Sequence, residues 1–421
     1  MASNRLRDLD IAATLHPYTQ LRRHEAVGPL IITGGDGVHV IEENGRRYID
    51  AMAGLWCASL GFSEPRLATA AERQLRRLGF YHQFSHKAHD QGIELAAKLI
   101  ELAPVKMGKV LFANSGSESN DTAVKLIWYI NNALGRPLKK KIVARQQAYH
   151  GVTIASASMT RLAVNNRDFD LPIDRFLHVT CPHAYHQAQP GEDDSAFVAR
   201  LANELEALIL SEGPDTVAAF FAEPVMGAGG VIVPPEGYFP RMQEVCRRYD
   251  VLMVADEVIC GFYRTGRRWG SETLNYAPDM LTCAKALSAG FLPISALMLT
   301  DRLYQIIADN SAKIGSFGHG YTYSGHPVPC AVALETLKIY EERDIAGQVA
   351  KTAPVMQAHL RSLADHPLVG EVRGIGMIGA VELVEDKAVR RNFDPARGIA
   401  AKVVETMQKN GGIHIIVTEM A

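Results

Sequence analysis

Residues 251–267, VLMVADEVICGFYRTGR, decide how this chain folds. The run from Val251 to Ala255 is apolar, and the acidic pair Asp256 and Glu257 follows it at once. This pattern predicts a strand that is buried on both faces, as in a parallel sheet, with carboxylates at its C-terminal end. In open α/β sheets that edge is where ligands bind. For this stretch alone a second interpretation stays open, in which the acids only cap the next turn.

A lysine, Lys285, follows downstream among small and apolar residues in CAKALSAG. A carboxylate at a strand end and a lysine in apolar surroundings suit pyridoxal phosphate (PLP), the first for its pyridine nitrogen and the second for its aldehyde. A strand that ends in Asp-Glu also occurs in P-loop ATPases. Those proteins need a G-x-x-x-x-G-K-[ST] loop, which this sequence does not contain.

Composition narrows the classes of function. The chain has 421 residues, 47% of them hydrophobic, and a net charge of −2, which predicts a soluble α/β protein without a nucleic-acid or anionic membrane partner. The N-terminus lacks the apolar core of a signal peptide, and no apolar run reaches the ~18 residues of a membrane helix. The six cysteines are scattered without a C-x-x-C pair, so we expect a reducing, cytoplasmic location.

Residues 110–133, VLFANSGSESNDTAVKLIWYINNA, predict a short strand that runs into a helix. The loop between them carries Ser115, Gly116 and Ser117. Small residues at a helix start expose backbone N–H groups and the positive end of the helix dipole, which together bind phosphate. An ordinary N-cap by one of the two serines is the alternative and needs no ligand.

Two further predicted strands, 142–144 and 217–222, end in residues suited to the same site. After the first strand, the ring of Tyr149 could stack on a planar ligand and Gly151 would let the backbone approach that ligand. A place for Tyr149 in the apolar core is an equal alternative. After the second, a proline stops the strand and a glycine-rich loop follows. The residues at these ends are Tyr149, His150, Gly151 and Glu223.

Two patterns point to other chemistry. His82, His86 and His89 have a spacing that could place imidazoles on one helical face, but no acidic or cysteine partner recurs nearby, so we predict no metal there. Residues 374–379, GIGMIG, match the dinucleotide fingerprint, yet they lead into a strand where the fingerprint requires a helix. We therefore predict a hairpin turn.

The remaining segments complete an α/β fold in which strands and helices alternate, which implies a mostly parallel central sheet. A small antiparallel unit is expected at 29–51, with helices at 66–78, 197–210, 239–250 and 331–343. We expect an N-terminal segment over 1–65, a large domain over 66–330 and a small α+β domain over 331–421.

Six motifs occur in the order found in the class III aminotransferases, which this chain resembles from about residue 25 to residue 405. They are NSGSESNDTAVKL, AYHG, AEPVMGAGG, ADEVICGFYRTG, AKALSAGFLPISA and HGYTYSGHP. GLWCASLG and DEVI look most like the ω-transaminase branch, because the ornithine and γ-aminobutyrate branches usually carry Gln in place of Ile259. The resemblance implies a fold-type I PLP enzyme with a large domain and a small α+β domain built from both termini.

The resemblance also implies roles for single residues. Lys285 would bind the cofactor aldehyde covalently and then act as general base and acid, and Asp256 would pair with the pyridine nitrogen. Tyr149 and Val258 would lie on opposite faces of the ring. The remaining assignments are Gly116 and Ser117 for the phosphate, Thr322 for the phosphate of the neighbouring subunit's cofactor, and Trp56, Phe84 and Tyr149 for the substrate pocket.

The implied reaction moves an amino group from a primary amine or ω-amino acid to pyruvate or a similar keto acid, in a homodimer or a pair of dimers. Family members continue further at the C-terminus, where an arginine handles the substrate carboxylate, and this sequence has no arginine after Arg397. A shortened tail and impaired catalysis are therefore alternatives. So are a mutase or decarboxylating relative and, from the glycine pattern, a nicotinamide dehydrogenase.

Overall fold

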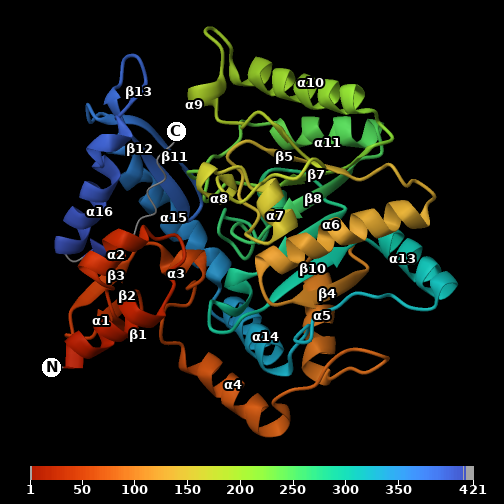
Figure 1. The fold of residues 1–421 in the computed structure, drawn as a ribbon, viewed down its shortest axis with the longest axis horizontal. Helices are drawn as coiled ribbons and strands as arrows, with labels where there is room; N and C mark the ends of the chain where they lie inside the picture. The colour runs from red at the N-terminus through yellow and green to blue at the C-terminus, as the bar shows by residue number, and fades with distance from the viewer. Residues whose placement is uncertain (1, 411, 414–421) are drawn as a thin grey trace. The chain divides into compact units, whose positions relative to one another are not determined.

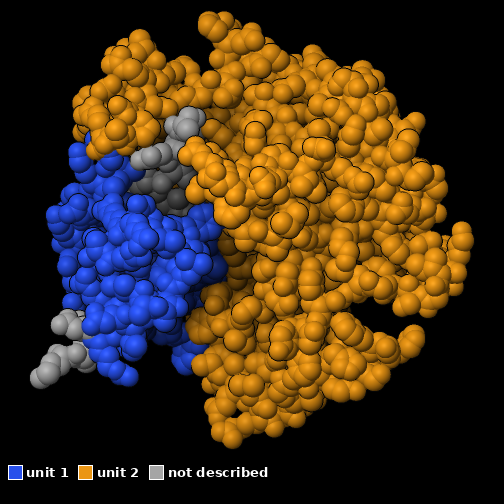
Figure 2. Space-filling view, in the orientation of Figure 1, with its two compact units in different colours: residues 1–65, 398–417 blue, residues 66–397, 418–421 orange. Residues whose placement is uncertain are grey.

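The structure is a computed structural model that describes residues 2–410 and 412–413. It divides into two compact units, residues 1–65 with 398–417 and residues 66–397 with 418–421 (Figure 2). The smaller unit thus combines the N-terminal segment with a segment that begins at residue 398. Residues 331–397, which we expected in a C-terminal domain, belong to the larger unit. No helix of the described residues is long and apolar enough to cross a membrane.

The smaller unit contains a four-stranded sheet in the order β1-β2-β3-β14. The first three strands pair antiparallel, which confirms the antiparallel unit expected near 29–51. The short strand β14 pairs parallel to β3, so the two ends of the chain share one sheet. The elements are α1 (Ala2–Ala13), α2 (Leu21–Val27), β1 (Ile32–Asp36), β2 (His39–Glu42), β3 (Arg47–Asp50), α3 (Ala53–Trp56), α16 (Ile399–Lys409) and β14 (Gly412–Ile413).

The short element α3 has an unusual backbone. Ala53, Gly54, Leu55 and Trp56 all have φ between 48° and 67°, which is the left-handed region. Each non-glycine residue there costs roughly 1–2 kcal/mol. Such strain is kept where the surrounding structure enforces it, and it gathers at functional sites. It falls here on Trp56, a predicted substrate-pocket residue.

The larger unit is built around a seven-stranded sheet in the order β4-β10-β9-β8-β7-β5-β6 (Figure 1). Strand β10 runs antiparallel to both of its neighbours, and the other adjacent pairs are parallel. This arrangement confirms the mostly parallel sheet. The strands are β4 (Lys109–Ala113), β5 (Lys141–Arg145), β6 (Phe176–Val179), β7 (Val217–Ala222), β8 (Leu252–Asp256), β9 (Met280–Cys283) and β10 (Ser295–Leu299).

Helices connect these strands, and the one that matters most for the site is α6 (Gly116–Ala133), which packs against β4, β7, β9 and β10. Its buried face carries Ala123, Ile127 and Ile130. These residues join Phe221 and Val254 of the sheet in one apolar core. The other helices include α4 (Pro65–Leu78), α5 (Asp90–Leu102), α10 (Asp194–Glu212), α11 (Tyr238–Arg248), α13 (Asp301–Ile314), α14 (Pro327–Glu342) and α15 (Ile345–Arg361).

A smaller sheet of the larger unit settles the glycine pattern at 374–379. Strands β11 (Val369–Ile375) and β12 (Ile378–Asp386) pair antiparallel and are joined by Gly376 and Met377. Gly376 has φ +58°, as a tight turn requires. The predicted hairpin turn is confirmed, and a strand follows where a dinucleotide site needs a helix.

Candidate active site

Several site residues of the larger unit lie at the C-terminal ends of β4, β5, β7, β8 and β9 or in the loops that follow these ends. These strands all point the same way, because each adjacent pair among β5, β7, β8 and β9 is parallel and β4 is antiparallel to the reversed strand β10. Their C-terminal ends therefore meet at one edge of the sheet. This is the edge at which open α/β sheets bind ligands.

Asp256 is the last residue of β8 and is buried. Its Oδ2 accepts hydrogen bonds from the Nδ2 of Asn120 at 2.8 Å and pairs with the Nδ1 of His150 at 2.8 Å. Its Oδ1 accepts from the backbone N–H of Val258 at 3.1 Å. A carboxylate offers about four acceptor positions. Three are used in this way, so Oδ1 keeps room for one further donor, such as a protonated pyridine nitrogen.

Asn120 is the residue of this network that the sequence reasoning missed. Besides Asp256 it donates to the backbone oxygen of His150 at 2.7 Å, and it accepts from the hydroxyl of Thr282 at 2.8 Å. Asn120, on α6, therefore holds the carboxylate of Asp256 in place, and the hydroxyl of Thr282, on β9, holds Asn120. A signal was present in the sequence, because Asn120 shares the face of the helix that carries Ala123 and Ile127, and a polar residue on an apolar face calls for partners.

The start of α6 forms a tight cradle of backbone. Ser115 is the N-cap and its hydroxyl accepts from the backbone N–H of Glu118 at 3.2 Å, so the N-cap interpretation holds for this serine. A Cβ on Gly116 would lie 3.0 Å from a methyl group of Val258. Gly151 has φ +131°, and a Cβ there would lie 2.4 Å from the Oγ of Ser117. Only glycines allow this approach, as a phosphate site at a helix start requires.

Glu223 follows β7 and is buried. One oxygen accepts from the backbone N–H of Tyr149 at 3.0 Å and the other from that of Gly227 at 3.1 Å. Burial raises the pKa of this carboxyl group. Glu223 therefore positions the loop that carries Tyr149.

Lys285 begins the short helix η1 (Lys285–Ser288) directly after β9, and it is partly buried. Its φ is +49°, a value that a lysine adopts only at an energetic cost. The next residue, Ala286, is held in place by a hydrogen bond, because the hydroxyl of Tyr340 donates to its backbone oxygen at 2.6 Å. Strain held in place by surrounding contacts is common at catalytic positions.

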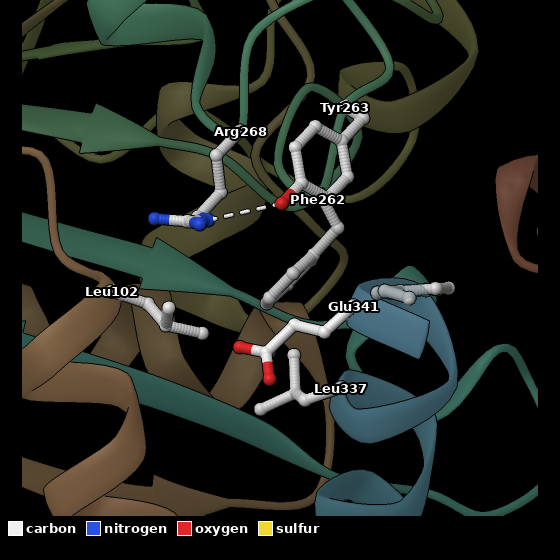
Figure 3. Close-up of a pocket in the computed structure, with 7 residues that line it drawn as sticks. Leu102, Phe262, Tyr263, Arg268, Leu337 and Glu341 are labelled. Atoms are coloured by element: carbon white, nitrogen blue, oxygen red, sulfur yellow. Dashed lines mark hydrogen bonds between the residues drawn. The ribbon is translucent and has the colours of Figure 1, made fainter. Parts of the chain in front are cut away.

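A small cavity includes Phe262 and Tyr263 of the loop after β8 in its lining. It is lined by Leu102, Phe262, Tyr263, Arg268, Leu337, Tyr340 and Glu341, and the Nε of Arg268 donates to the hydroxyl of Tyr263 at 3.3 Å (Figure 3). Its volume of about 10 Å³ holds at most a single water molecule. The space for an amine substrate is therefore not this cavity.

The remaining predicted residues lie on loops or in the other unit. Phe84 packs near Gly320, since a Cβ added there would lie 2.7 Å from its ring. Thr322 is exposed on the same loop, which is tied to α6 by a hydrogen bond between the hydroxyls of Tyr321 and Thr122 at 3.1 Å. Trp56 belongs to the smaller unit.

The histidines at 82, 86 and 89 have separate surroundings. The Nε2 of His89 lies 2.5 Å from the backbone oxygen of Gly325, and its Nδ1 caps α5. The Nδ1 of His82 accepts from the backbone N–H of Phe84 at 3.2 Å. His86 lies in a turn with φ +65°. The spacing that suggested one helical face does not produce one, because α5 begins only at Asp90.

Comparison with known proteins agrees with this geometry. The family described as Aminotransferase class-III matches residues 21–420. The gamma aminobutyrate transaminase 3, chloroplastic, of Solanum lycopersicum is 50% identical over 398 residues, which are 94% of this chain and 76% of the relative. The vanillin aminotransferase of Capsicum chinense is 51% identical over 366 residues, 87% of this chain and 80% of the relative.

Solved structures give the same answer for the fold. The omega transaminase from Pseudomonas jessenii in complex with PMP is 53% identical, with a TM-score of 0.96 over 97% of this chain and 90% of that chain. A thermostable variant engineered for asymmetric synthesis of enantiopure bulky amines has a TM-score of 0.95 at 52% identity, over 97% of this chain and 91% of that one. The chain therefore belongs to the class III aminotransferases, as a PLP-dependent transaminase with the fold-type I architecture.

Proposed function

We propose that this enzyme transfers an amino group from a primary amine or an ω-amino acid to pyruvate or a similar keto acid. The observation that carries the proposal is the placement of Asp256. It is a buried carboxylate, held by Asn120 and His150, with one acceptor position left at the ligand-binding edge of the sheet. A carboxylate in this place keeps a pyridine nitrogen protonated by direct charge attraction.

In the proposed mechanism, bound PLP supplies the electron sink that makes the Cα–H bond of the donor acidic. Lys285 would hold the cofactor aldehyde in the resting enzyme. Its freed Nζ would take the proton from the donor carbon as general base and return it as general acid. The N-terminus of α6 with Ser115, Gly116 and Ser117 would bind the phosphate. Val258, which packs against Gly116, would cover one face of the ring and Tyr149 the other.

Two observations support the proposed class of amino donor, namely the named relatives and the residue at position 259. The relatives named above are transaminases of γ-aminobutyrate and vanillin, and the similar solved structures are omega transaminases. Ile259, buried against Gly227, offers no amide to the cofactor. This favours the ω-transaminase branch. Phe84 would line the donor pocket.

A donor panel with pyruvate as acceptor tests this proposal. The panel contains β-alanine, γ-aminobutyrate, 1-phenylethylamine and vanillylamine, and formation of alanine is measured. Alanine formed with at least one of them supports the proposal. The reverse test supplies alanine alone and measures pyruvate and the pyridoxamine form of the cofactor in a single turnover. A mutase would isomerise its substrate without any external acceptor, and a catalytically impaired chain would bind cofactor but fail this half-reaction with every donor.

We also propose a homodimer in the cytoplasm. Thr322 is exposed on its loop, where it could reach the cofactor phosphate of a second subunit. The six cysteines are scattered along the sequence without a C-x-x-C pair, as expected in a reducing compartment. Sedimentation of the holoenzyme tests the first point, where a monomer that transaminates would contradict it. Cell fractionation tests the second.

A further inference from the structure

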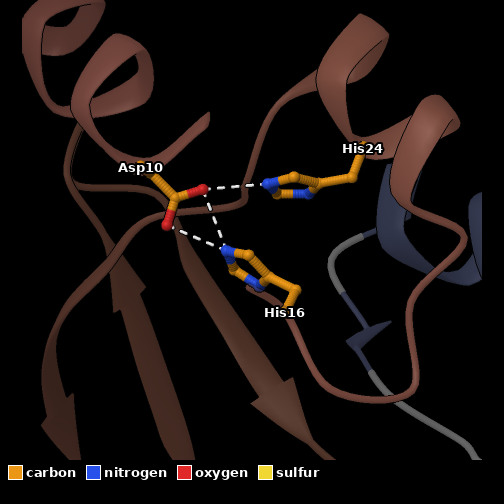
Figure 4. Close-up of side chains that lie close together, drawn as sticks. All are labelled: Asp10, His16 and His24. Atoms are coloured by element: carbon orange, nitrogen blue, oxygen red, sulfur yellow. Dashed lines mark hydrogen bonds and ion pairs between the residues drawn. The ribbon is translucent and has the colours of Figure 1, made fainter. Parts of the chain in front are cut away.

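Three side chains of the smaller unit point their polar atoms at one another, although they come from different segments. Asp10 lies on α1, His24 lies on α2, and His16 lies on the connection between the two helices. The Nε2 of His16 lies 2.9 Å from both carboxylate oxygens of Asp10, and the Nε2 of His24 lies 2.9 Å from Oδ2 (Figure 4). The ligand atoms all lie within 4.8 Å of one another.

The geometry is close to that of a three-ligand metal site. A tetrahedral Zn²⁺ with bonds of about 2.0–2.1 Å keeps its ligand atoms roughly 3.3 Å apart. The nitrogen–oxygen distances of 2.9 Å need to widen by only a few tenths of an ångström. The two imidazole rings lie next to each other, with centroids 4.1 Å apart and planes tilted by 36°. Both rings turn Nε2 toward Asp10, and a water molecule would complete the four ligands of a tetrahedral ion.

The electrostatics also suit a cation. The ion pairs of Asp10 among the described residues are those with His16 and His24, and neither lysine nor arginine takes part in them. Two neutral imidazoles and one carboxylate carry a net charge of −1. The site is only partly exposed, with 10% of the His24 side chain accessible. Partial burial strengthens the attraction between a cation and this carboxylate.

The surrounding helices hold the three side chains in place without help from an ion. The Nη2 of Arg7 donates to the backbone oxygen of Ala26 at 3.1 Å and so ties α1 to α2. The side chain of Gln20 caps α2 by accepting from the backbone N–H of Arg23. The backbone N–H of Thr14 donates to the oxygen of Asp10 at 2.9 Å. Preorganised ligands lower the cost of binding a metal.

We propose that Asp10, His16 and His24 bind one divalent first-row transition-metal ion, with Zn²⁺ as the representative, which clamps α1 to α2. On binding, the two hydrogen bonds to Asp10 break and three metal–ligand bonds form. Each neutral imidazole shifts its proton from Nε2, which donates to Asp10 in the metal-free protein, to Nδ1 by exchange with solvent and then coordinates through Nε2, so the charge of the protein groups is unchanged. Imidazole nitrogens favour Zn²⁺, Cu²⁺ and Ni²⁺ over Mg²⁺ and Ca²⁺, which prefer oxygen ligands.

A second cluster of the same residue types provides an internal comparison. His183, His186 and Glu382 in the larger unit also converge. There, however, the Nη1 of Arg373 lies 2.5 Å from Glu382 and 2.7 Å from Glu371. The guanidinium of Arg373 therefore pairs with the one carboxylate of the cluster, Glu382, as well as with Glu371, and it repels a cation. We therefore expect the second cluster to bind no metal, and the difference between the two depends on Arg373.

The test uses the full-length, PLP-loaded protein after removal of metals with a chelator. Zn²⁺ is titrated in competition with a chromogenic chelator at neutral pH. The variants His16→Gln and His24→Gln keep an N–H donor for Asp10 but lose the nitrogen that coordinates a metal. His186→Gln serves as the control in the second cluster, and His366→Gln as the control for an exposed histidine.

We expect one Zn²⁺ per chain in the wild type that is lost, or weakened by at least about 10-fold, in His16→Gln and His24→Gln, and unchanged in both controls. Added Zn²⁺ should raise the melting temperature of the wild type and not that of His24→Gln. Co²⁺ should give the intense visible absorption of tetrahedral coordination. Equal zinc binding in wild type and His24→Gln, or none in the wild type, would overturn the proposal.

Discussion

Replacing Asn120 by alanine is expected to loosen the group that holds Asp256. Asn120 makes hydrogen bonds to Asp256 at 2.8 Å, to the backbone oxygen of His150 at 2.7 Å and to Thr282 at 2.8 Å, all of them buried. The bond to the carboxylate contributes about 1.5–3 kcal/mol and each neutral bond about 1 kcal/mol. The free energy of unfolding of the holoenzyme should therefore fall by about 3–5 kcal/mol.

The variant Thr282→Val separates this network from a simple loss of packing. It removes one neutral bond and leaves the side-chain oxygen of Asn120 without a donor, so its cost should be about 1–2 kcal/mol. In Asn120→Ala the hydroxyl of Thr282 has already lost its hydrogen-bond partner. Adding Thr282→Val to that variant should therefore change the free energy of unfolding by almost nothing. The double-mutant cycle should thus give a coupling of about 1–2 kcal/mol.

Two assays measure these effects. Urea unfolding of the PLP-loaded protein, followed by tryptophan fluorescence, gives the stability of each variant. Absorbance titration with PLP gives the cofactor affinity, which should fall in Asn120→Ala because Asp256 is no longer oriented. If Asn120→Ala lost less than about 1 kcal/mol and bound PLP as the wild type does, the account of the network would be wrong.

Three further outcomes are expected. Lys285→Ala should abolish transamination while leaving the circular dichroism spectrum intact, and more than a trace of residual turnover in a single-turnover assay would contradict the role of the lysine. Gly151→Ala should lower the free energy of unfolding in urea by about 2–4 kcal/mol, since it adds a 2.4 Å contact to a strained φ. The control Gly191→Ala, where φ is +81° and no atom lies within 4 Å, should lower it by only about 1 kcal/mol. Equal losses of stability in the two variants would refute the contact at Gly151. Burial raises the pKa of the Glu257 carboxyl group to about 7, so its contribution to the free energy of unfolding is present at low pH and falls by about 3 kcal/mol as the pH rises from about 4.5 to 7. The variant Glu257→Gln should flatten that part of the pH profile of unfolding. An unchanged slope would exclude Glu257 as its source.

Much of the fold was predictable because it depends on local patterns. The apolar run before Asp256 became β8, the run 217–222 became β7, and the helix expected at 66–78 became α4. The hairpin at 374–379 followed from the strand after its glycines. The reversal of β10 was not predicted, because an apolar run has the same composition in either direction.

The predictions for the site divide in the same way. Asp256, Glu223 and Tyr149 were selected because they lie at or after the ends of predicted strands, and they do lie at or after the ends of β8, β7 and β5. Lys285 was selected as a lysine among small and apolar residues, and it follows β9. Their roles toward the cofactor stay predictions. The packing of Gly151 against Ser117 could not be read from the sequence, because it depends on two loops from different strands coming together.

The sequence by itself determined which residues end the strands and which motifs match a family, because alternation, apolar runs and glycine loops are properties of neighbouring residues. Only the tertiary structure decided what surrounds each of them. Asn120 lies 136 positions from Asp256 and 162 from Thr282, and His150 lies 106 from Asp256. The cluster of Asp10 with two histidines likewise needs α1 and α2 to lie side by side. The physical reason is that hydrogen bonds and metal ligands depend on distances of about 2–3 Å, which strand order and helix packing set.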